Sequence, residues 1–374
     1  MSIIVALLVF GLLIFFHELG HFLLAKRGGI GVTSFSIGMG PAIWKKQIGE
    51  TEYCLRILPF GGSCAMVGED EESDAENAFN KKGVWTRISV VAAGPIFNFI
   101  LAFVGAIIMI LCIGVDKPII SEMMDGYPAY EAGVRAGDEI ISMNGRNIGV
   151  YRDVSMYIQL HQGENIDLVY ERDEERYETT IVPKKGEDGY YLMGITGGAY
   201  TKCENPFEVV KYAGAEVGYW IHMVFDSLKM LVSGQVGRED VGGPVRIVGM
   251  MGDVYKESAA ISGFAVFINL LNIVIFLSAN LGVMNLLPIP ALDGGRLFIM
   301  LIEVVTRRRV PEKIEGYIHM AGFAILMGLM VLILFSQWNR FPVNLISVPT
   351  LLRSASNCLL SVIVLPFRRQ KYTP

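Results

Sequence analysis

The sequence is poor in charged residues for its length. Of its 374 residues, 18% are Asp, Glu, Lys or Arg, whereas about 25% is usual for soluble domains. The formal net charge is −5 at pH 7, which excludes the strongly basic surface by which proteins bind nucleic acids. We therefore expect a membrane protein without a nucleic-acid partner.

Cysteine pairs are also lacking. No Cys-x-x-Cys pair occurs, and the five cysteines are widely separated, at positions 54, 64, 112, 203 and 358. Neither a disulfide framework nor a cysteine zinc site is expected from this spacing. The N-terminus lacks the basic region of a signal peptide, so we expect its apolar run to be retained as a membrane helix.

The sequence instead contains long apolar runs, and 52% of its residues are hydrophobic. A helix needs about 20 apolar residues to cross a bilayer, with a lower limit of roughly 17. Four runs reach this limit: about Ile3–Ala25, Ile88–Ile113, Ile261–Leu287 and Ile318–Phe335. The predicted fold class is therefore an α-helical multi-span membrane protein with about four transmembrane helices.

The first run contains the sequence His17-Glu18-Leu19-Gly20-His21. Two histidines one helical turn apart lie on the same face and can bind one zinc ion. Glu18 then lies beside the zinc-bound water as a general base. Ionisable groups inside a membrane helix are costly, and a metal supplies a reason for them. The alternative is an ordinary helix that happens to carry polar residues.

A catalytic zinc usually has three protein ligands, and Asp293 is the best candidate for the third. It follows the third run, in the sequence Pro-Ile-Pro-Ala-Leu-Asp-Gly-Gly at 288–295. The first and third runs cross in the same direction, so Asp293 can meet His17 and His21 near the inner side. The prolines break the helix and can turn the aspartate inward. The alternative is a plain residue at the end of a helix.

Asn98, Asn280 and Asn285 are among the asparagines at membrane depth, where an amide needs a polar partner. Asn98 follows a Gly-Pro pair in the second run, and Asn280 and Asn285 lie near the end of the third. We predict that all three bind substrate, and Asn280 or Asn285 could also stabilise an oxyanion. A contact between neighbouring helices is the alternative for each.

Basic residues are concentrated in the connections 26–87 and 296–313. The positive-inside rule places both in the cytosol. The N-terminus and the long segment 116–258 are then extracytoplasmic, and the active site lies toward the cytosolic side. We expect a multi-pass protein of the plasma or inner membrane.

The segment Gly31–Gly68 alternates between apolar and polar residues and is rich in glycine. This pattern predicts short strands or a hairpin. The segment either dips into the membrane beside the metal motif, where protein can cover irregular backbone, or forms an ordinary cytosolic hairpin.

The predicted order of elements after the second run resembles a circularly permuted PDZ domain, which binds extended peptides by adding a strand to a sheet edge. An Asn-Gly pair of hairpin type joins two of these elements. The expected elements are a short helix at Ala129–Ala132, a strand at Glu139–Met143, a helix at Tyr151–His161 and strands at Asn165–Arg172 and Arg176–Pro183.

The sequence thus predicts five parts. Residues 1–113 form a membrane region with the His-Glu-x-x-His helix and a small membrane-associated β region, and residues 114–200 an inserted extracytoplasmic α+β PDZ-like domain. Residues 201–260 form an extracytoplasmic linker whose helix, Phe207–Val232, lies on the membrane surface or packs on the spans. Residues 261–336 form a second membrane region, and the tail 337–374 has no predicted structure.

These features together resemble the site-2 protease family in its bacterial RseP/RasP-type form. They are the His-Glu-x-x-His motif, Gly-Pro-x-x-Asn at 94–98, the PDZ-like domain, and Asn-x-x-Pro-x-Pro-x-Leu-Asp-Gly at 285–294. The resemblance covers about residues 1–335. It implies that His17, His21 and Asp293 bind Zn²⁺, that Glu18 is the catalytic base and that Asn285 lies near the scissile bond.

The resemblance also implies a function, namely hydrolysis of peptide bonds within transmembrane segments by a zinc metalloprotease. Family substrates are single-pass membrane proteins, such as anti-sigma factors or remnant signal peptides. An upstream site-1-type protease cuts them first, and the PDZ-like domain would filter the pre-cleaved forms. The implied partners are these substrates, the upstream protease and the lipid bilayer.

Two other classes of function fit part of the sequence. A non-catalytic adaptor would bind peptides through the PDZ-like domain, but such a protein would be expected to lack Glu18 or Asp293. A metal transporter would carry several sets of intramembrane ligands along a path, whereas the sequence contains one.

Overall fold

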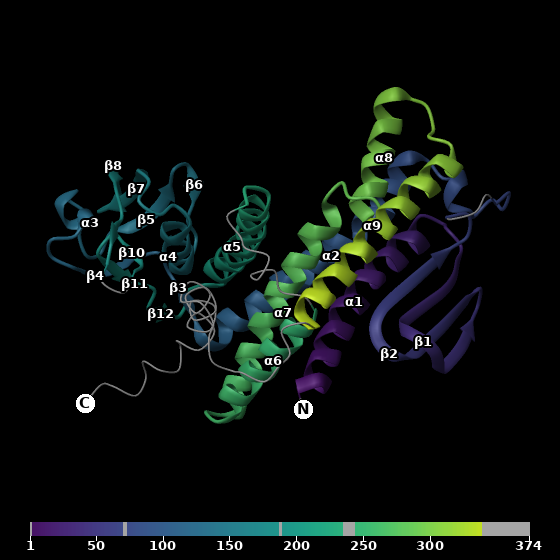
Figure 1. Ribbon diagram of the computed structural model, residues 1–374, viewed down its shortest axis with the longest axis horizontal. Helices are drawn as coiled ribbons and strands as arrows, with labels where there is room; N and C mark the ends of the chain where they lie inside the picture. The colour runs from purple at the N-terminus through teal and green to yellow at the C-terminus, as the bar shows by residue number, and fades with distance from the viewer. Residues whose placement is uncertain (1, 70–72, 187–188, 235–243, 339–374) are drawn as a thin grey trace. The chain divides into compact units, whose positions relative to one another are not determined.

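The computed structural model describes residues 2–69, 73–186, 189–234 and 244–338 (Figure 1). The chain divides into two compact units. The first contains the described residues up to Ala102 and from Gly234 onward, and the second contains Phe103–Ser233. The predicted tail falls outside the described residues, except for its first two positions.

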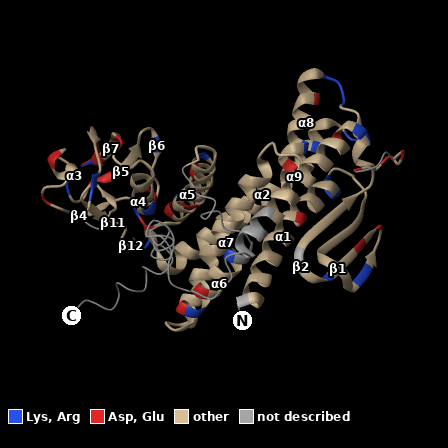
Figure 2. Ribbon diagram, viewed as in Figure 1, with Lys and Arg blue, Asp and Glu red and all other residues tan. Residues whose placement is uncertain are grey.

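Among the described residues, four helices are long and apolar enough to cross a membrane: α1 (Ser2–Arg27), α2 (Val84–Ile113), α7 (Gly263–Leu286) and α9 (Glu312–Trp338). They coincide with the four predicted runs, although α9 begins earlier than expected. Their ribbons carry few charged residues (Figure 2). The protein is therefore mostly helical with four candidate membrane spans, as the fold prediction required.

Helices α1 and α2 approach each other at a pair of small residues. A Cβ atom at Gly20 would lie 2.4 Å from the carbonyl oxygen of Ala93, so only glycine allows this approach. Small residues are used in this way where membrane helices pack closely. The contact brings the middle of α2 against the turn of α1 that carries the two histidines.

Helix α6 (Pro244–Ala259) was not predicted, because its residues were assigned to the linker before the third run. It packs on α1 and α7. Met251 and Val254 are fully buried, and the side chain of Asn269 in α7 donates to the hydroxyl of Ser258 over 2.8 Å. An amphipathic helix of this kind shows a weaker sequence signal than a continuous apolar run.

Helix α8 (Asp293–Thr306) was also not predicted, because the Pro- and Gly-rich stretch before it indicates a loop. A pair of buried charges holds α8 against α2. The Nη2 atom of Arg87 donates to both carboxylate oxygens of Glu303, over 2.6 and 2.7 Å. Arg296, also on α8, pairs with Glu69.

The predicted β region is a hairpin of two long strands, β1 (Val32–Ile48) and β2 (Thr51–Met66), rather than several short ones. The strands pair antiparallel, and residues 34–37 of β1 pair with β2 twice, at 52–55 and at 62–65. The short helix η1 (Phe79–Lys81) follows. The stretch 62–66 has β1 on one side and no strand on the other among the described residues, so it forms an edge of the sheet.

The second unit contains a four-stranded sheet in the order β6-β5-β7-β8. The five predicted elements all occur, with bounds within about two residues of those expected: α3 (Pro128–Glu131), β5 (Glu139–Met143), α4 (Tyr151–Leu160), β7 (Ile166–Arg172) and β8 (Glu175–Ile181). Further short strands were not predicted: β3 (Val115–Asp116), β4 (Ile120–Met123), β6 (Arg146–Asn147), β9 (Lys184–Lys185), β10 (Tyr191–Leu192), β11 (Ile195–Gly197) and β12 (Tyr200–Thr201).

Helix α5 (Pro206–Val232) packs on this same unit, a partner that the sequence did not suggest. Arg152 of α4 bonds to Asp116 over 3.0 Å and to Glu216 of α5. The indole of Trp220 donates to Glu216 over 3.0 Å. Burial raises the pKa of Glu216 above its ordinary value. The buried charges therefore fix α5 to α4 and, through Arg152, to β3, and the indole bond lies within α5 itself. The expected contact of α5 with the membrane stays a prediction.

Candidate metal centre

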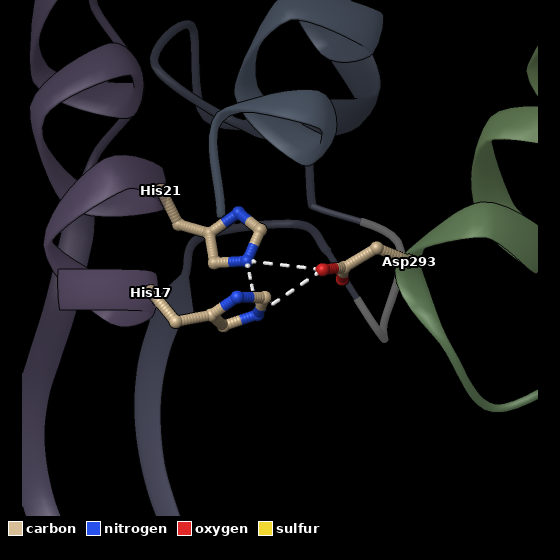
Figure 3. Close-up of side chains that lie close together, drawn as sticks. All are labelled: His17, His21 and Asp293. Carbon is tan, nitrogen blue, oxygen red and sulfur yellow. Dashed lines mark hydrogen bonds and ion pairs between the residues drawn. The ribbon is translucent and has the colours of Figure 1, made fainter. Parts of the chain in front are cut away.

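Two histidines of α1 present the same nitrogen to one point (Figure 3). His17 and His21 lie four residues apart, and their Nε2 atoms are separated by 3.2 Å. This is the arrangement expected from the helical period. His21 is buried and His17 is half-buried, so both rings are largely removed from solvent.

Asp293, the first residue of α8, faces both rings (Figure 3). Its Oδ2 atom lies 3.1 Å from Nε2 of His17 and 3.4 Å from Nε2 of His21. The three donor atoms all lie within 4.8 Å of one another. The structure thus brings together three residues that the sequence singled out and that come from opposite ends of the chain.

The separations of these donor atoms fit a tetrahedral zinc ion. Bonds of about 2.1 Å place two tetrahedral ligands about 3.4 Å apart, and the three distances here run from 3.1 to 3.4 Å. The Oδ2 atom of Asp293 is buried and makes no hydrogen bond among the described residues. Two nitrogens and an oxygen therefore converge on one point, and such a set of ligand atoms suits a cation.

Helix α2 contacts the far side of both rings. Nδ1 of His21 lies 2.9 Å from the carbonyl oxygen of Val90, and Nδ1 of His17 lies 3.1 Å from Nδ2 of Asn98. Such contacts leave Nε2 for a metal and fix the orientation of the ring. Gly94 of α2 lies close to both rings, and its lack of a side chain leaves room for them. A Cβ atom there would lie 2.3 Å from Nε2 of His21.

A cavity of about 610 Å³ opens beside the three donor atoms. Glu18 lines it and lies against the edge of β2: a Cβ atom at Gly62 would be 2.8 Å from its Cγ atom. The backbone of Cys64 hydrogen-bonds to the Glu18 side chain. A carboxylate therefore borders the space in which a reactant beside the metal would lie.

Cys64 also lines this cavity, but its chemistry is that of a neutral thiol. Burial raises the pKa of the Cys64 thiol to about 12. Because the thiolate is the nucleophile and metal ligand, this side chain is not prepared for either task at neutral pH. Of the two side chains Cys64 and Glu18, the carboxylate of Glu18 is therefore the one suited to acid–base chemistry.

The predicted substrate-binding asparagines occupy different surroundings. Asn98 is fully buried and contacts His17, so its described partner is a histidine of the site. Asn280 and Asn285 are half-buried on α7, and neither lines the cavity among the residues that the structure describes. Their role in substrate binding stays a prediction.

The side chains that line the cavity without having been predicted include Arg296 of α8 and His319 of α9. A single histidine in an apolar run has no spacing partner, so nothing in the sequence marks His319. Arg296 was counted only as part of a basic connection. The contacts of Asp293 with the two histidines and of His319 with Ala291 bring α8 and α9 to the site.

Comparison with known proteins decides the family. Residues 5–329 match peptidase family M50, the family of the site-2 proteases. The chain belongs to this family. It is therefore a zinc metalloprotease and a membrane protein, and the resemblance inferred from its motifs is confirmed. M50 membership also supports Zn²⁺ as the cofactor, in agreement with the donor set of Figure 3.

Individual relatives cover nearly the whole M50 chain. A protein of Clostridium acetobutylicum that is named as a zinc metalloprotease is 40% identical over 344 residues, which is 92% of this chain and 98% of the relative. The regulator of sigma-W protease RasP of Bacillus subtilis is 29% identical over 423 residues, with coverage of 91% and 98%.

One solved structure with similarity to part of this chain is the PDZ domain of the SdrC-like protein of Listeria monocytogenes. It is 21% identical, covers 23% of this chain and 90% of its own, and has a TM-score of 0.21. The PDZ-like character of residues 114–200 stays a prediction from the order of their elements.

Proposed function

We propose that this M50 protease cleaves peptide bonds within the transmembrane segments of single-pass membrane proteins. The observation that carries the proposal is the position of the cluster of His17, His21 and Asp293. Two of the three side chains lie in the C-terminal half of α1, within a helix long and apolar enough to span a bilayer. A metal centre at that depth acts on a substrate that is itself in the membrane.

We assign zinc binding to His17, His21 and Asp293. Zinc held by these three residues would supply a Lewis acid for the scissile carbonyl and would lower the pKa of its water to about 7. Glu18 borders the same cavity. It accepts the proton of the attacking water and delivers it to the leaving amine nitrogen, as a general base and then a general acid.

Asn98 supports this assignment through His17. A histidine that binds zinc by Nε2 carries its proton on Nδ1 and needs an acceptor there. Turning the amide of Asn98 by 180° places Oδ1 at that position, and this oxygen has no other hydrogen-bond partner among the described residues. Nδ1–H of His17 then donates to Oδ1 of Asn98, and both polar atoms have a hydrogen-bond partner.

The edge of β2 offers a way to hold the substrate extended. A transmembrane helix must be unwound before cleavage, because its carbonyls are engaged in i to i−4 hydrogen bonds. Residues 62–66 form a sheet edge beside Glu18. An unwound segment that adds to this edge as a strand brings its backbone alongside the catalytic base.

The proposed topology keeps both basic connections in the cytosol. Arg309, after α8, donates to the carbonyl oxygens of Asn80 and Lys82, over 2.6 and 3.3 Å. Contact between the two connections supports placing them on the same side of the membrane, with the N-terminus on the other. The active site is then nearer the cytosolic face.

The proposed substrates are anti-sigma factors or remnant signal peptides, already shortened by an upstream site-1-type protease. The name of the Bacillus subtilis relative, a regulator of sigma-W, favours the first of these. In the same proposal the PDZ-like domain filters the pre-cleaved substrates.

The test is cleavage of a tagged single-pass membrane protein with its extracytoplasmic domain already truncated, in liposomes. Cleavage within the span that is lost in Glu18→Gln and on zinc chelation supports the proposal. Zinc content measured in parallel should be unchanged in Glu18→Gln, since this residue is not assigned as a ligand. Equal cleavage by Glu18→Gln would show that the catalytic base is misassigned. Zinc-loaded protein that cuts none of the substrate types would favour the adaptor.

A further inference from the structure

The segment that delivers Asp293 to the metal centre is irregular and contains two prolines. It runs from the end of α7 at Leu286 to the start of α8 at Asp293. Pro288 and Pro290 have no backbone N–H and fix their own φ angles. This segment determines where the carboxylate of Asp293 lies, because it sets the starting point and direction of α8.

The remaining backbone N–H groups of residues 288–292 can be assigned one by one. That of Ile289 donates to the carbonyl oxygen of Leu287 over 2.7 Å, and that of Leu292 donates to Ile289 over 3.2 Å. The third, of Ala291, donates to Nδ1 of His319 over 2.9 Å. A side chain of α9 therefore completes the hydrogen bonding of this segment.

Ala291 is held in an unfavourable backbone conformation. Its φ angle is +78°, in the left-handed region that non-glycine residues seldom adopt. Such a conformation persists where surrounding contacts impose it. The hydrogen bond to His319 is one of these contacts, and it acts on the residue two positions before Asp293.

A second contact from the same helix acts on the neighbouring residue. A Cβ atom at Gly322 would lie 2.3 Å from Cβ of Pro290 and 2.6 Å from its carbonyl oxygen. Gly322 is nearly one helical turn after His319, so both lie on the face of α9 that meets this segment. Helix α9 thus contacts the segment through a hydrogen bond and through close backbone packing.

We propose that His319 is a positioning residue for Asp293. Its Nδ1 atom accepts the hydrogen bond of Ala291 and keeps that residue at positive φ, so that α8 begins where its aspartate meets the two histidines. Because Nδ1 accepts a hydrogen bond, His319 is neutral and carries its proton on Nε2. This Nε2 atom lies 3.9 Å from Oε1 of Glu315. The inference rests on the proposed role of Asp293 as a zinc ligand.

The experiment measures zinc affinity of the full-length protein in detergent, by competition with a chelating dye. His319→Leu removes the acceptor and should weaken zinc binding by about 10- to 100-fold, the usual cost of losing a group that orients a metal ligand. His319→Asn is the matched variant, because its side-chain oxygen can occupy the position of Nδ1. It should bind zinc within a few-fold of the native protein.

A second-site change distinguishes positioning from general damage to α9. Glycine adopts positive φ without steric cost, so Ala291→Gly should restore part of the zinc affinity lost in His319→Leu. A chain whose α9 packing had simply failed would gain nothing from this change.

The outcomes separate the inference from the proposed function. If Asp293→Ala binds zinc like the native protein, the ligand assignment is wrong and the inference falls with it. If Asp293→Ala loses zinc but His319→Leu retains native affinity, the proposed function stands and the positioning role is wrong. The positioning role would be established if zinc affinity is lost in His319→Leu, retained in His319→Asn and partly restored by adding Ala291→Gly to His319→Leu.

Discussion

Asn98 of α2 and His17 of α1 lie 3.1 Å apart, from Nδ2 to Nδ1, in a contact between two candidate membrane spans in which Asn98 is fully buried. Asn98→Leu leaves the ring of His17 without its polar partner, so we expect zinc affinity to fall about 10- to 100-fold. Ser278→Ala is the control, since Ser278 donates only to the backbone carbonyl of Asn98 over 2.7 Å. Equal zinc affinity in Asn98→Leu and Ser278→Ala would contradict the prediction.

Gly94 should tolerate no side chain. In Gly94→Ala the new methyl group would lie 2.3 Å from Nε2 of His21 and 2.7 Å from Cε1 of His17, so at least one ring must move. We expect loss of bound zinc and of proteolysis. The same substitution at Gly249 of α6, where nothing lies within 4 Å, should leave both unchanged. Zinc content per chain, measured by atomic emission, checks the pair.

The ion pair of Arg87 and Glu303 should matter for stability as well as for the site. Its side chains are 10% and 16% exposed, and breaking a buried pair costs about 3–5 kcal/mol. Glu303→Ala should therefore lower the thermal midpoint of the detergent-solubilised protein and weaken zinc binding, because α8 carries Asp293. Asp74→Ala removes the exposed pair with Lys81 and should change neither. A native-like midpoint in Glu303→Ala would show that other contacts hold α8.

Tyr212 should make the stability of the second unit depend on alkaline pH. Burial, aided by nearby carboxylates, raises the pKa of Tyr212 to about 12, whereas an unfolded tyrosine ionises near pH ~10. The folded state then holds the proton that the unfolded state has lost, so stability falls as the pH rises from about 10 to 12. In Tyr212→Phe, tyrosinate absorbance should show one fewer tyrosine with a pKa of about 12. If the substitution instead removes a group that ionises near pH ~10, the assignment is wrong.

Much of the fold follows from local pattern. Apolar length predicted the four long helices, and alternation with turn residues predicted the strands of the second unit. The spacing of His17 and His21 placed both on one face of a helix. Asp293 required one further step, namely that two spans with the same direction bring their inner ends together. The sequence contains all of these signals within short windows.

The features that were missed depend on packing between distant segments. Helix α8 follows a Pro- and Gly-rich stretch whose local preference is for a turn, and its pairing of Glu303 with Arg87 joins residues far apart in the chain. His319 meets Ala291 only because α9 lies beside the α7–α8 connection. Asn98 was correctly expected to need a polar partner, but its contact with His17 depends on the close approach at Gly20.

The distribution of the donor set along the chain has a consequence for biosynthesis. His17 and His21 are among the first residues to leave the ribosome, whereas Asp293 follows only after α2, the whole second unit, α6 and α7 have been made. Two histidines alone lack the third ligand of a catalytic zinc site. The nascent chain therefore stays inactive while it is threaded into the bilayer, and proteolytic capacity arises only when insertion is nearly complete. The order of synthesis thus protects neighbouring nascent membrane proteins from premature cleavage.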